Sequence, residues 1–321
     1  MTTKDERQPF ICIDGFQGSR LDDSYVQKLR RGGVSAFFSN VSNSHQTLRE
    51  TMNSLLTFRR FVEESPDLSF CTSASDIERA IGAGRIGVLA TFQDSYCLGY
   101  DVDLIELFHT LGVRMVQLTA NDRNVIGDGC GEPANAGLSK LGKRLVKTMN
   151  QLGILIDLSH VGDATRRDAL ELSDSPVVFS HGNARGCCDN VRNIADEDVK
   201  LLAKRGGVIG ATTYPTLCTW EKKPTIDSFL DNVRYMVDLV GIDHVGLGLG
   251  QIEGLDIDDY LAKYPEMYGV DPWPEGVESV TAWPLILEKL SDRGFSTEDV
   301  AKIAGGNFLR VYRLVFDGRQ A

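Results

Sequence analysis

The stretch Gly153-Ile-Leu-Ile-Asp-Leu-Ser-His160 decides the expected fold, together with a second, similar stretch, Ser175-Pro-Val-Val-Phe-Ser-His181. Each is a short run rich in Ile, Leu and Val that ends in Ser-His. A continuous apolar run of this length is typical of a strand buried on both faces, as in a parallel sheet. Because the carboxyl ends of such strands carry the chemistry of α/β folds, His160 and His181 are candidate site residues. The alternative is a pair of structural histidines satisfied by hydrogen bonds.

Length and composition are those of an acidic globular chain with a large core. The 321 residues suit one α/β barrel, and the content is 42% hydrophobic and 25% charged. The net charge of −11 argues against nucleic acid and against an anionic membrane surface as partners. Residues 1–9 are polar, so we expect a flexible start and no signal peptide. Seven mostly scattered cysteines suit a reducing compartment, which predicts a cytoplasmic location.

Strand-like runs alternate with helical patterns along the whole chain. The predicted strands cover 10–14, 33–39, 86–93, 113–119, 153–160, 175–181, 207–213 and 244–249. Apolar residues at helical spacing separate them, and three more helices are expected at 284–292, 297–304 and 307–314. Strands alternating with helices form βαβ units. Eight such units predict an α/β fold of the TIM type, a (β/α)8 barrel that forms a single domain over 1–321 with extra C-terminal helices.

In such a barrel the strand ends collect on one face, and this places several polar residues there. We expect Asp14 to act with His160 and His181 in catalysis. The predicted substrate contacts are Gln93, Asn124 and Tyr214.

Arg192 follows the second Ser-His run and could hold a substrate carboxylate through two parallel hydrogen bonds. Alternatively, it is a surface cation that caps a helix or pairs with Asp196 or Glu197. Two neutral imidazoles with nearby carboxylates could hold zinc, with a bound water as nucleophile. Cys187 or Cys188 acting with a histidine is a further, weaker alternative.

Several longer motifs resemble the renal (membrane) dipeptidase family of metallopeptidases. They lie at 142–160, 176–185, 192–196, 206–210, 241–248 and 305–310, and the similarity extends from about the first strand to the end. The resemblance implies a TIM-like barrel with a two-zinc site that hydrolyses dipeptides, including those with a C-terminal D-residue. It also implies that His160 and His181 hold the second zinc and that Arg192 binds the substrate carboxylate.

Other positions depart from the family pattern. The family's first strand ends in Asp-Gly-His-x-Asp, whose His and second Asp bind the first zinc, whereas this chain has Asp14-Gly-Phe-Gln-Gly18. Gln93 replaces the Glu that bridges both metals, and Ala120 replaces a substrate-contacting His. Gly250 lies near the position of the Asp that handles the proton of the attacking water. Too little negative charge remains to balance two Zn²⁺ ions in a partly dry cavity.

We therefore expect at most one zinc ion on His160 and His181, with a third ligand from Asp14, Asp94 or Glu253; a metal-free site is the equal alternative. The predicted function is that of a divergent dipeptidase-family hydrolase acting on a dipeptide-like or small amide substrate. Two alternatives stay open. One is a metal-independent lyase, isomerase or decarboxylase acting on a small carboxylic acid. The other is a catalytically inactive binding protein.

The expected partner is thus a small molecule. Aromatic residues in the segment 260–268 and at Trp273 could form either a lid over the barrel mouth or the interface of a homodimer.

Overall fold

The computed structural model describes residues 10–42, 44–220, 224–256, 258–265, 267–268 and 273–318. Residues 1–9, predicted to be flexible, lie outside the described residues, as does part of the segment 260–268.

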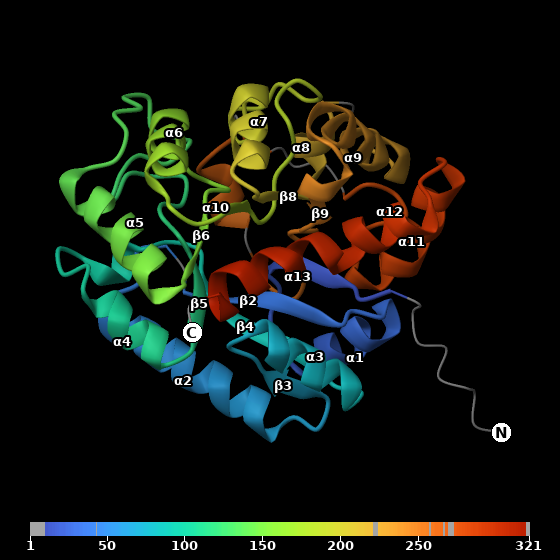
Figure 1. Cartoon of the computed structure of the whole chain (residues 1–321), viewed down its shortest axis with the longest axis horizontal. Helices are drawn as coiled ribbons and strands as arrows, with labels where there is room; N and C mark the ends of the chain where they lie inside the picture. The colour runs from blue at the N-terminus through green and yellow to red at the C-terminus, as the bar shows by residue number, and fades with distance from the viewer. Residues whose placement is uncertain are drawn as a thin grey trace.

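Eight parallel strands close into a barrel (Figure 1). They are β1 (Ile13–Gln17), β2 (Ala36–Ser42), β4 (Ile86–Phe92), β5 (Val113–Gln117), β6 (Leu155–Asp157), β7 (Val178–Phe179), β8 (Val208–Ala211) and β9 (Val245–Leu247). Neighbouring strands pair in this order, and the pairing of β9 with β1 closes the ring. The predicted TIM-type (β/α)8 barrel is confirmed. A short additional strand, β3 (Leu68–Phe70), pairs with the start of β4 and was not predicted.

Helices surround the barrel, each with one apolar face buried against the strands. They are α1 (Asp23–Gly32), α2 (Leu48–Glu64), α3 (Ala74–Gly82), α4 (Leu104–Thr110), α5 (Lys140–Leu152), α6 (Asp163–Leu172), α7 (Asp196–Lys204) and α9 (Ile226–Val240). Helix α5, which leads into β6, begins at Ser139, whose side chain caps the amide of Gly142. It ends at Gly153, whose φ of 72° is the left-handed conformation that glycine adopts without strain.

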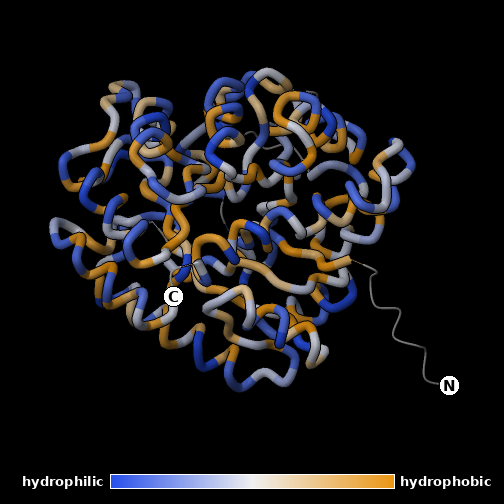
Figure 2. Tube along the Cα trace, in the orientation of Figure 1, coloured by the Kyte–Doolittle hydropathy of each residue, from blue (hydrophilic) through white to orange (hydrophobic). Residues whose placement is uncertain are grey.

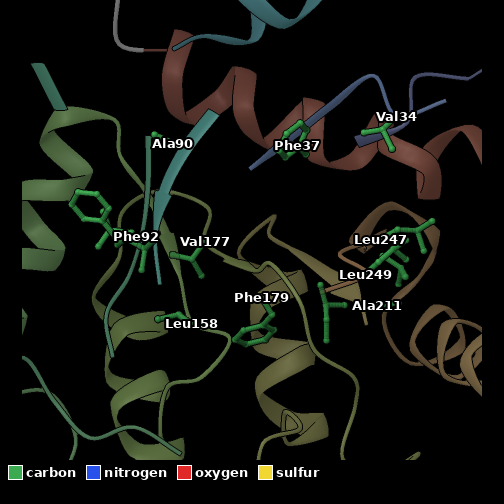
Figure 3. Packing of buried hydrophobic residues seen from close by; sticks show 14 of the residues in the cluster. Val34, Phe37, Ala90, Phe92, Leu158, Val177, Phe179, Ala211, Leu247 and Leu249 are labelled. Atoms are coloured by element: carbon green, nitrogen blue, oxygen red, sulfur yellow. The ribbon is translucent and has the colours of Figure 1, made fainter. Parts of the chain in front are cut away.

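The strands divide their side chains between two buried clusters, as the two-residue period of a strand requires. In β2, Phe37 packs outward among the helices, whereas Ala36 and Phe38 face the barrel interior. Figure 3 shows outward-facing residues from several strands, including Phe37, Phe92 and Leu247, in this outer layer. In Figure 2 the central strands are mostly hydrophobic, and hydrophilic stretches lie at the periphery.

The last three α-helices follow the last strand, and α13, the final one, closes the amino-terminal end of the barrel. They are α11 (Trp283–Asp292), α12 (Thr297–Ala301) and α13 (Asn307–Tyr312), which confirms the predicted extra C-terminal helices. Asn307 donates to the carbonyls of Ile242 and Val245 at the start of β9, both at 2.8 Å. Phe308 enters the barrel beside Gly15, where a Cβ would lie only 2.6 Å from its ring. The opposite end, where the strands finish, is left for a site.

Two short helices follow the last two strands, α8 (Pro215–Cys218) after β8 and α10 (Asp258–Ala262) after β9. Helix α10 lies in a stretch that sequence patterns assign to a loop. Within the described part of the chain, we find no helix with both the length and the apolar character needed to cross a bilayer.

Candidate active site at the carboxyl ends of the strands

A cavity of about 460 Å³ opens where the barrel strands end. The residues that line it are Phe16, Gly18, Asn40, Ser44, His45, Gln93, His160, His181, Arg192, Thr212, Tyr214, Leu217, Gly250, Ile252, Leu255, Asp256, Leu261, Lys263, Tyr264 and Tyr268. The structure therefore brings together five of the predicted site residues, which are His160, His181, Arg192, Gln93 and Tyr214.

The two histidines meet at the centre of this cavity. Strands β6 and β7 are neighbours, so their Ser-His ends lie side by side, and the two Nε2 atoms are 2.9 Å apart. Both side chains are almost fully buried. Burial, and after it the charge of Arg192, lowers the pKa of each imidazole well below its usual value. Both histidines are therefore neutral near pH 7.

Hydrogen bonds define how His160 is oriented. Its Nδ1 lies 2.7 Å from Asn121 Oδ1, and its Nε2 lies 3.2 Å from Gln93 Nε2. Because an amide nitrogen donates and a carbonyl oxygen accepts, His160 carries its proton on Nδ1 and presents the Nε2 lone pair. The Nε2 atom of His160 is thus an acceptor.

Asp157, which sequence reasoning did not select, holds the two strand ends against each other. Its carboxylate accepts from the hydroxyls of Ser159 and Ser180, each at 2.6 Å, and from their backbone amides at 3.1 and 3.0 Å. Ser180 Oγ in turn lies 2.7 Å from His181 Nδ1. A signal was present in the sequence, because a carboxylate inside a buried apolar run needs hydrogen-bonding partners.

Arg192 lies beneath the histidines and is 1% exposed. It donates to the backbone carbonyls of Ser159 and of His181, the latter at 2.9 Å. Among the described residues, no carboxylate lies within ion-pairing distance of its guanidinium. The alternative that Arg192 is a surface cation is therefore wrong.

Two departures from the family pattern shape one wall of the cavity. The ring of Phe16 stacks on that of His181, with centroids 4.1 Å apart and planes inclined by 14°. At Gly18, a Cβ would make only ordinary van der Waals contacts, the nearest at 3.5 Å, so this position could accommodate a side chain.

Asp14 and Asn124 are not among the lining residues of the cavity. Asp14 is fully buried and accepts from the amides of Phe16 (3.2 Å) and Leu249 (3.1 Å) and from Gln17. Asn124 donates to Asp94 at 2.7 Å and to Leu118 O at 2.9 Å. These positions favour a role for Asp14 and Asn124 in holding the strand ends in place. The catalytic role predicted for Asp14 and the substrate contact predicted for Asn124 stay predictions.

Cys187 and Cys188 also lie away from the cavity lining. Burial raises the pKa of Cys188 to about 11, which keeps its thiol protonated near neutral pH. This arrangement gives no support to a Cys–His nucleophile.

The remaining expected metal ligands are engaged elsewhere. Asp94 accepts from Asn124 and from the amides of Tyr96 and Ala120, and Glu253 accepts from Lys28, Ser279 and the amide of Val280. Within the described ranges, no three His, Cys, Asp or Glu side chains are placed to hold a metal ion together. Two imidazoles without a carboxylate do not fit a pair of zinc ions.

Comparison with known proteins places this barrel in a family. The family model for membrane dipeptidases, peptidase family M19, matches residues 16–320. The chain belongs to the membrane dipeptidase family. A solved structure assigned to family M19 is described as a metallo peptidase.

Individual members of the membrane dipeptidase family and its structural neighbours align along most of the chain. The dipeptidase aclJ of Aspergillus oryzae is 30% identical over 312 residues, which cover 90% of this chain and 70% of that protein. The dipeptidase tcpJ of Claviceps purpurea is 32% identical over 277 residues, covering 85% of this chain and 61% of that protein. The crystal structure of an amidohydrolase from Pseudomonas aeruginosa is 30% identical, with a TM-score of 0.91 over 96% of this chain and 97% of that one.

Proposed function

We propose that this barrel, acting as one domain over 1–321, hydrolyses small amides that carry a free carboxylate, with dipeptide-like compounds as the substrate class. The observation that carries the proposal is Arg192, a buried cation without an ion-pairing carboxylate among the described residues, beside two neutral imidazoles. A buried charge is costly unless it is paired, so the cavity favours an anionic ligand group. The dipeptidases among the relatives support the same substrate class.

In this proposal the substrate carboxylate binds at Arg192, and Gln93 and Tyr214 contact the rest of the molecule. One neutral imidazole accepts a proton as water attacks the amide carbonyl carbon, and the proton passes to the departing amine when the C–N bond breaks. At most one zinc ion takes part, because His160 and His181 meet in the cavity without a third His, Cys, Asp or Glu side chain placed to hold a metal ion with them among the described residues.

The site also suits a metal-independent lyase, isomerase or decarboxylase that acts on a small carboxylic acid. The observation in its favour is that both imidazoles are retained next to the carboxylate anchor, whereas Gln93 and Gly18 replace metal-binding carboxylates. A catalytically inactive binding protein would use Arg192 to hold the carboxylate of its ligand and would catalyse no reaction.

The proposal is tested with dipeptides and N-acyl amino acids, each supplied with a free or an amidated carboxyl end. The free acids should be cleaved, and Arg192→Met should raise their KM by about 30- to 150-fold, since a charge-assisted pair contributes about 2–3 kcal/mol. Amidated substrates should be poor for both proteins.

Arg205→Met is the matched control, because Arg205 also donates to two backbone carbonyls, those of Ser173 (3.2 Å) and Glu171 (3.1 Å), but away from the cavity. It should leave KM unchanged. Equal cleavage of free and amidated substrates would contradict the proposal that Arg192 binds the substrate carboxylate. Product analysis that shows a carboxylic acid converted without amide cleavage would favour the lyase or isomerase alternative, and binding without any product would favour the inactive protein.

Location and partners follow the same proposal. All seven cysteines are free thiols, which supports the cytoplasmic location that we propose. The net charge of −11 supports a small-molecule partner in preference to nucleic acid or a membrane surface. A homodimer stays a prediction.

A further inference from the structure

The cavity differs from a zinc site in its set of ligands. The Nε2 atoms of His160 and His181 lie 2.9 Å apart. Among the described residues, no third His, Cys, Asp or Glu side chain is placed to hold a metal ion with them, whereas a catalytic zinc site uses three protein ligands.

Gln93 is a second obstacle to a metal ion, because it occupies the Nε2 atom of His160. Its Nε2 donates to His160 Nε2 at 3.2 Å, so the lone pair that would bind a metal already accepts a hydrogen bond. The amide is held in this orientation because its Oε1 accepts from Asn40 Nδ2 at 3.4 Å. An amide is also a weak zinc ligand compared with the carboxylate found at this position in the family.

The charges around the cavity oppose a cation as well. Asp14, Asp94 and Glu253 are each held by hydrogen bonds outside the cavity lining. Asp256 is the one acidic residue among the described lining residues, and it is exposed at the mouth. Arg192 already places one positive charge at the floor, so a zinc ion there would add repulsion without a balancing carboxylate.

We infer that the cavity is a metal-independent site, in which Gln93, hydrogen-bonded to His160, and the two imidazoles occupy the place of the family's metal ions. The polar group of a substrate then contacts the imidazoles and the amide directly. The inference concerns the same cavity as the proposed function but does not depend on it, because metal content is measured without any substrate.

The test compares the metal content of the full-length protein with that of a variant in which ligands are restored. Wild-type protein from zinc-supplemented medium should contain well under one zinc per chain by mass spectrometry, and calorimetric titration with ZnCl₂ should show no tight site. Phe16→His/Gly18→Asp/Gln93→Glu should bind zinc more tightly by at least about 100-fold, since loss of an outer partner alone costs 10- to 100-fold in metal affinity. The aspartate can be accommodated because a Cβ at Gly18 has only ordinary contacts.

The control variant Phe16→Asn/Gly18→Asn keeps Gln93 and carries amides, which are weak zinc ligands, in place of the restored His and Asp, so it should not gain this affinity. One zinc per wild-type chain that is lost in His160→Ala/His181→Ala would overturn the inference. Zinc that survives in the double variant is bound elsewhere and leaves the cavity metal-free. If the restored variant fails to fold, the wild-type zinc content and that of the double variant decide alone.

Discussion

Replacing Asp14 with asparagine should remove a pH dependence of stability that the buried carboxyl imposes on the wild-type protein. Asp14 is fully buried between β1 and β9, where it accepts from the amides of Phe16 and Leu249. Burial raises its pKa to about 7, although hydrogen bonds from Phe16, Gln17 and Leu249 act in the opposite direction. The protonated carboxyl is therefore the form that the folded protein favours.

The sign and size of the effect follow from this shift. Between pH 3.8 and about 7 the folded protein binds the proton of Asp14 more tightly than the unfolded chain does. The contribution of this group is therefore most favourable below pH 3.8 and is lost as pH rises to about 7. At 1.36 kcal/mol per unit, the interval from 3.8 to about 7 corresponds to about 4 kcal/mol.

The assay is denaturant unfolding of wild type and Asp14→Asn at a series of pH values from acid to slightly alkaline. Other groups titrate alike in both proteins and cancel in the difference. The stability of the variant relative to wild type should rise by about 4 kcal/mol across the interval. A difference that stays flat, or that favours wild type as pH rises, would show that Asp14 is a stable carboxylate in the folded protein and would refute the reasoning. A loss of turnover in the variant well beyond any loss of stability would instead support the catalytic role predicted from sequence.

Two further predictions concern the histidine pair and the backbone around it. His181→Ala should abolish turnover with the fold retained, as measured by steady-state kinetics. The control is His244→Ala, because the His244 side chain is hydrogen-bonded to Gly207 O at 2.9 Å and lies outside the cavity lining; this variant should keep turnover near wild type. Unchanged turnover in His181→Ala would reject the role of His181. Gly248→Ala should destabilise the protein by more than about 2 kcal/mol in a denaturant titration, because its Cβ would lie 1.8 Å from Ser180 O in the packed interior. Gly82→Ala, which meets nothing within 4 Å, is the matched control and should be neutral or slightly stabilising; equal effects would contradict the close packing.

Much of the fold could be predicted because buried parallel strands are recognisable as continuous apolar runs. All eight barrel strands lie within the predicted runs or overlap them, and the Ser-His ends of β6 and β7 meet as expected. The three-residue strand β3 is too short to show a period, and the five-residue helix α10 lies in a segment rich in turn-forming residues.

The site was predicted less completely, because position at a strand end does not fix the direction of a side chain. Asp14 stands between Ile13 and Gly15, both of which face Phe308 and the barrel interior. The two-residue alternation of a strand therefore turns Asp14 away from the interior, towards Leu249. The same alternation, applied to Ile156 and Asp157, would have placed the Asp157 carboxylate inward. Partners such as Asn121 for His160 and Ser180 for Asp157 come from other strands and loops, and sequence spacing does not reveal them.

The residues that depart from the family pattern change the charge of the cavity together, and their effect is understood only from the whole set. A metal retained without carboxylates would be a buried, unpaired cation, which is costly by several kcal/mol. A carboxylate retained without a metal could instead pair with Arg192 in place of the carboxylate of a substrate. Gly18, Gln93 and Gly250 remove the anions at positions where the family uses them to bind metal or move a proton, and the remaining imidazoles are neutral. Arg192 then remains as a buried cation in the cavity lining, in electrostatic contact with the buried Asp157, and in the proposed function it also binds the carboxylate of the ligand. In the proposed function, the substitutions that we infer to disfavour zinc are also those that leave Arg192 to bind a single anionic group.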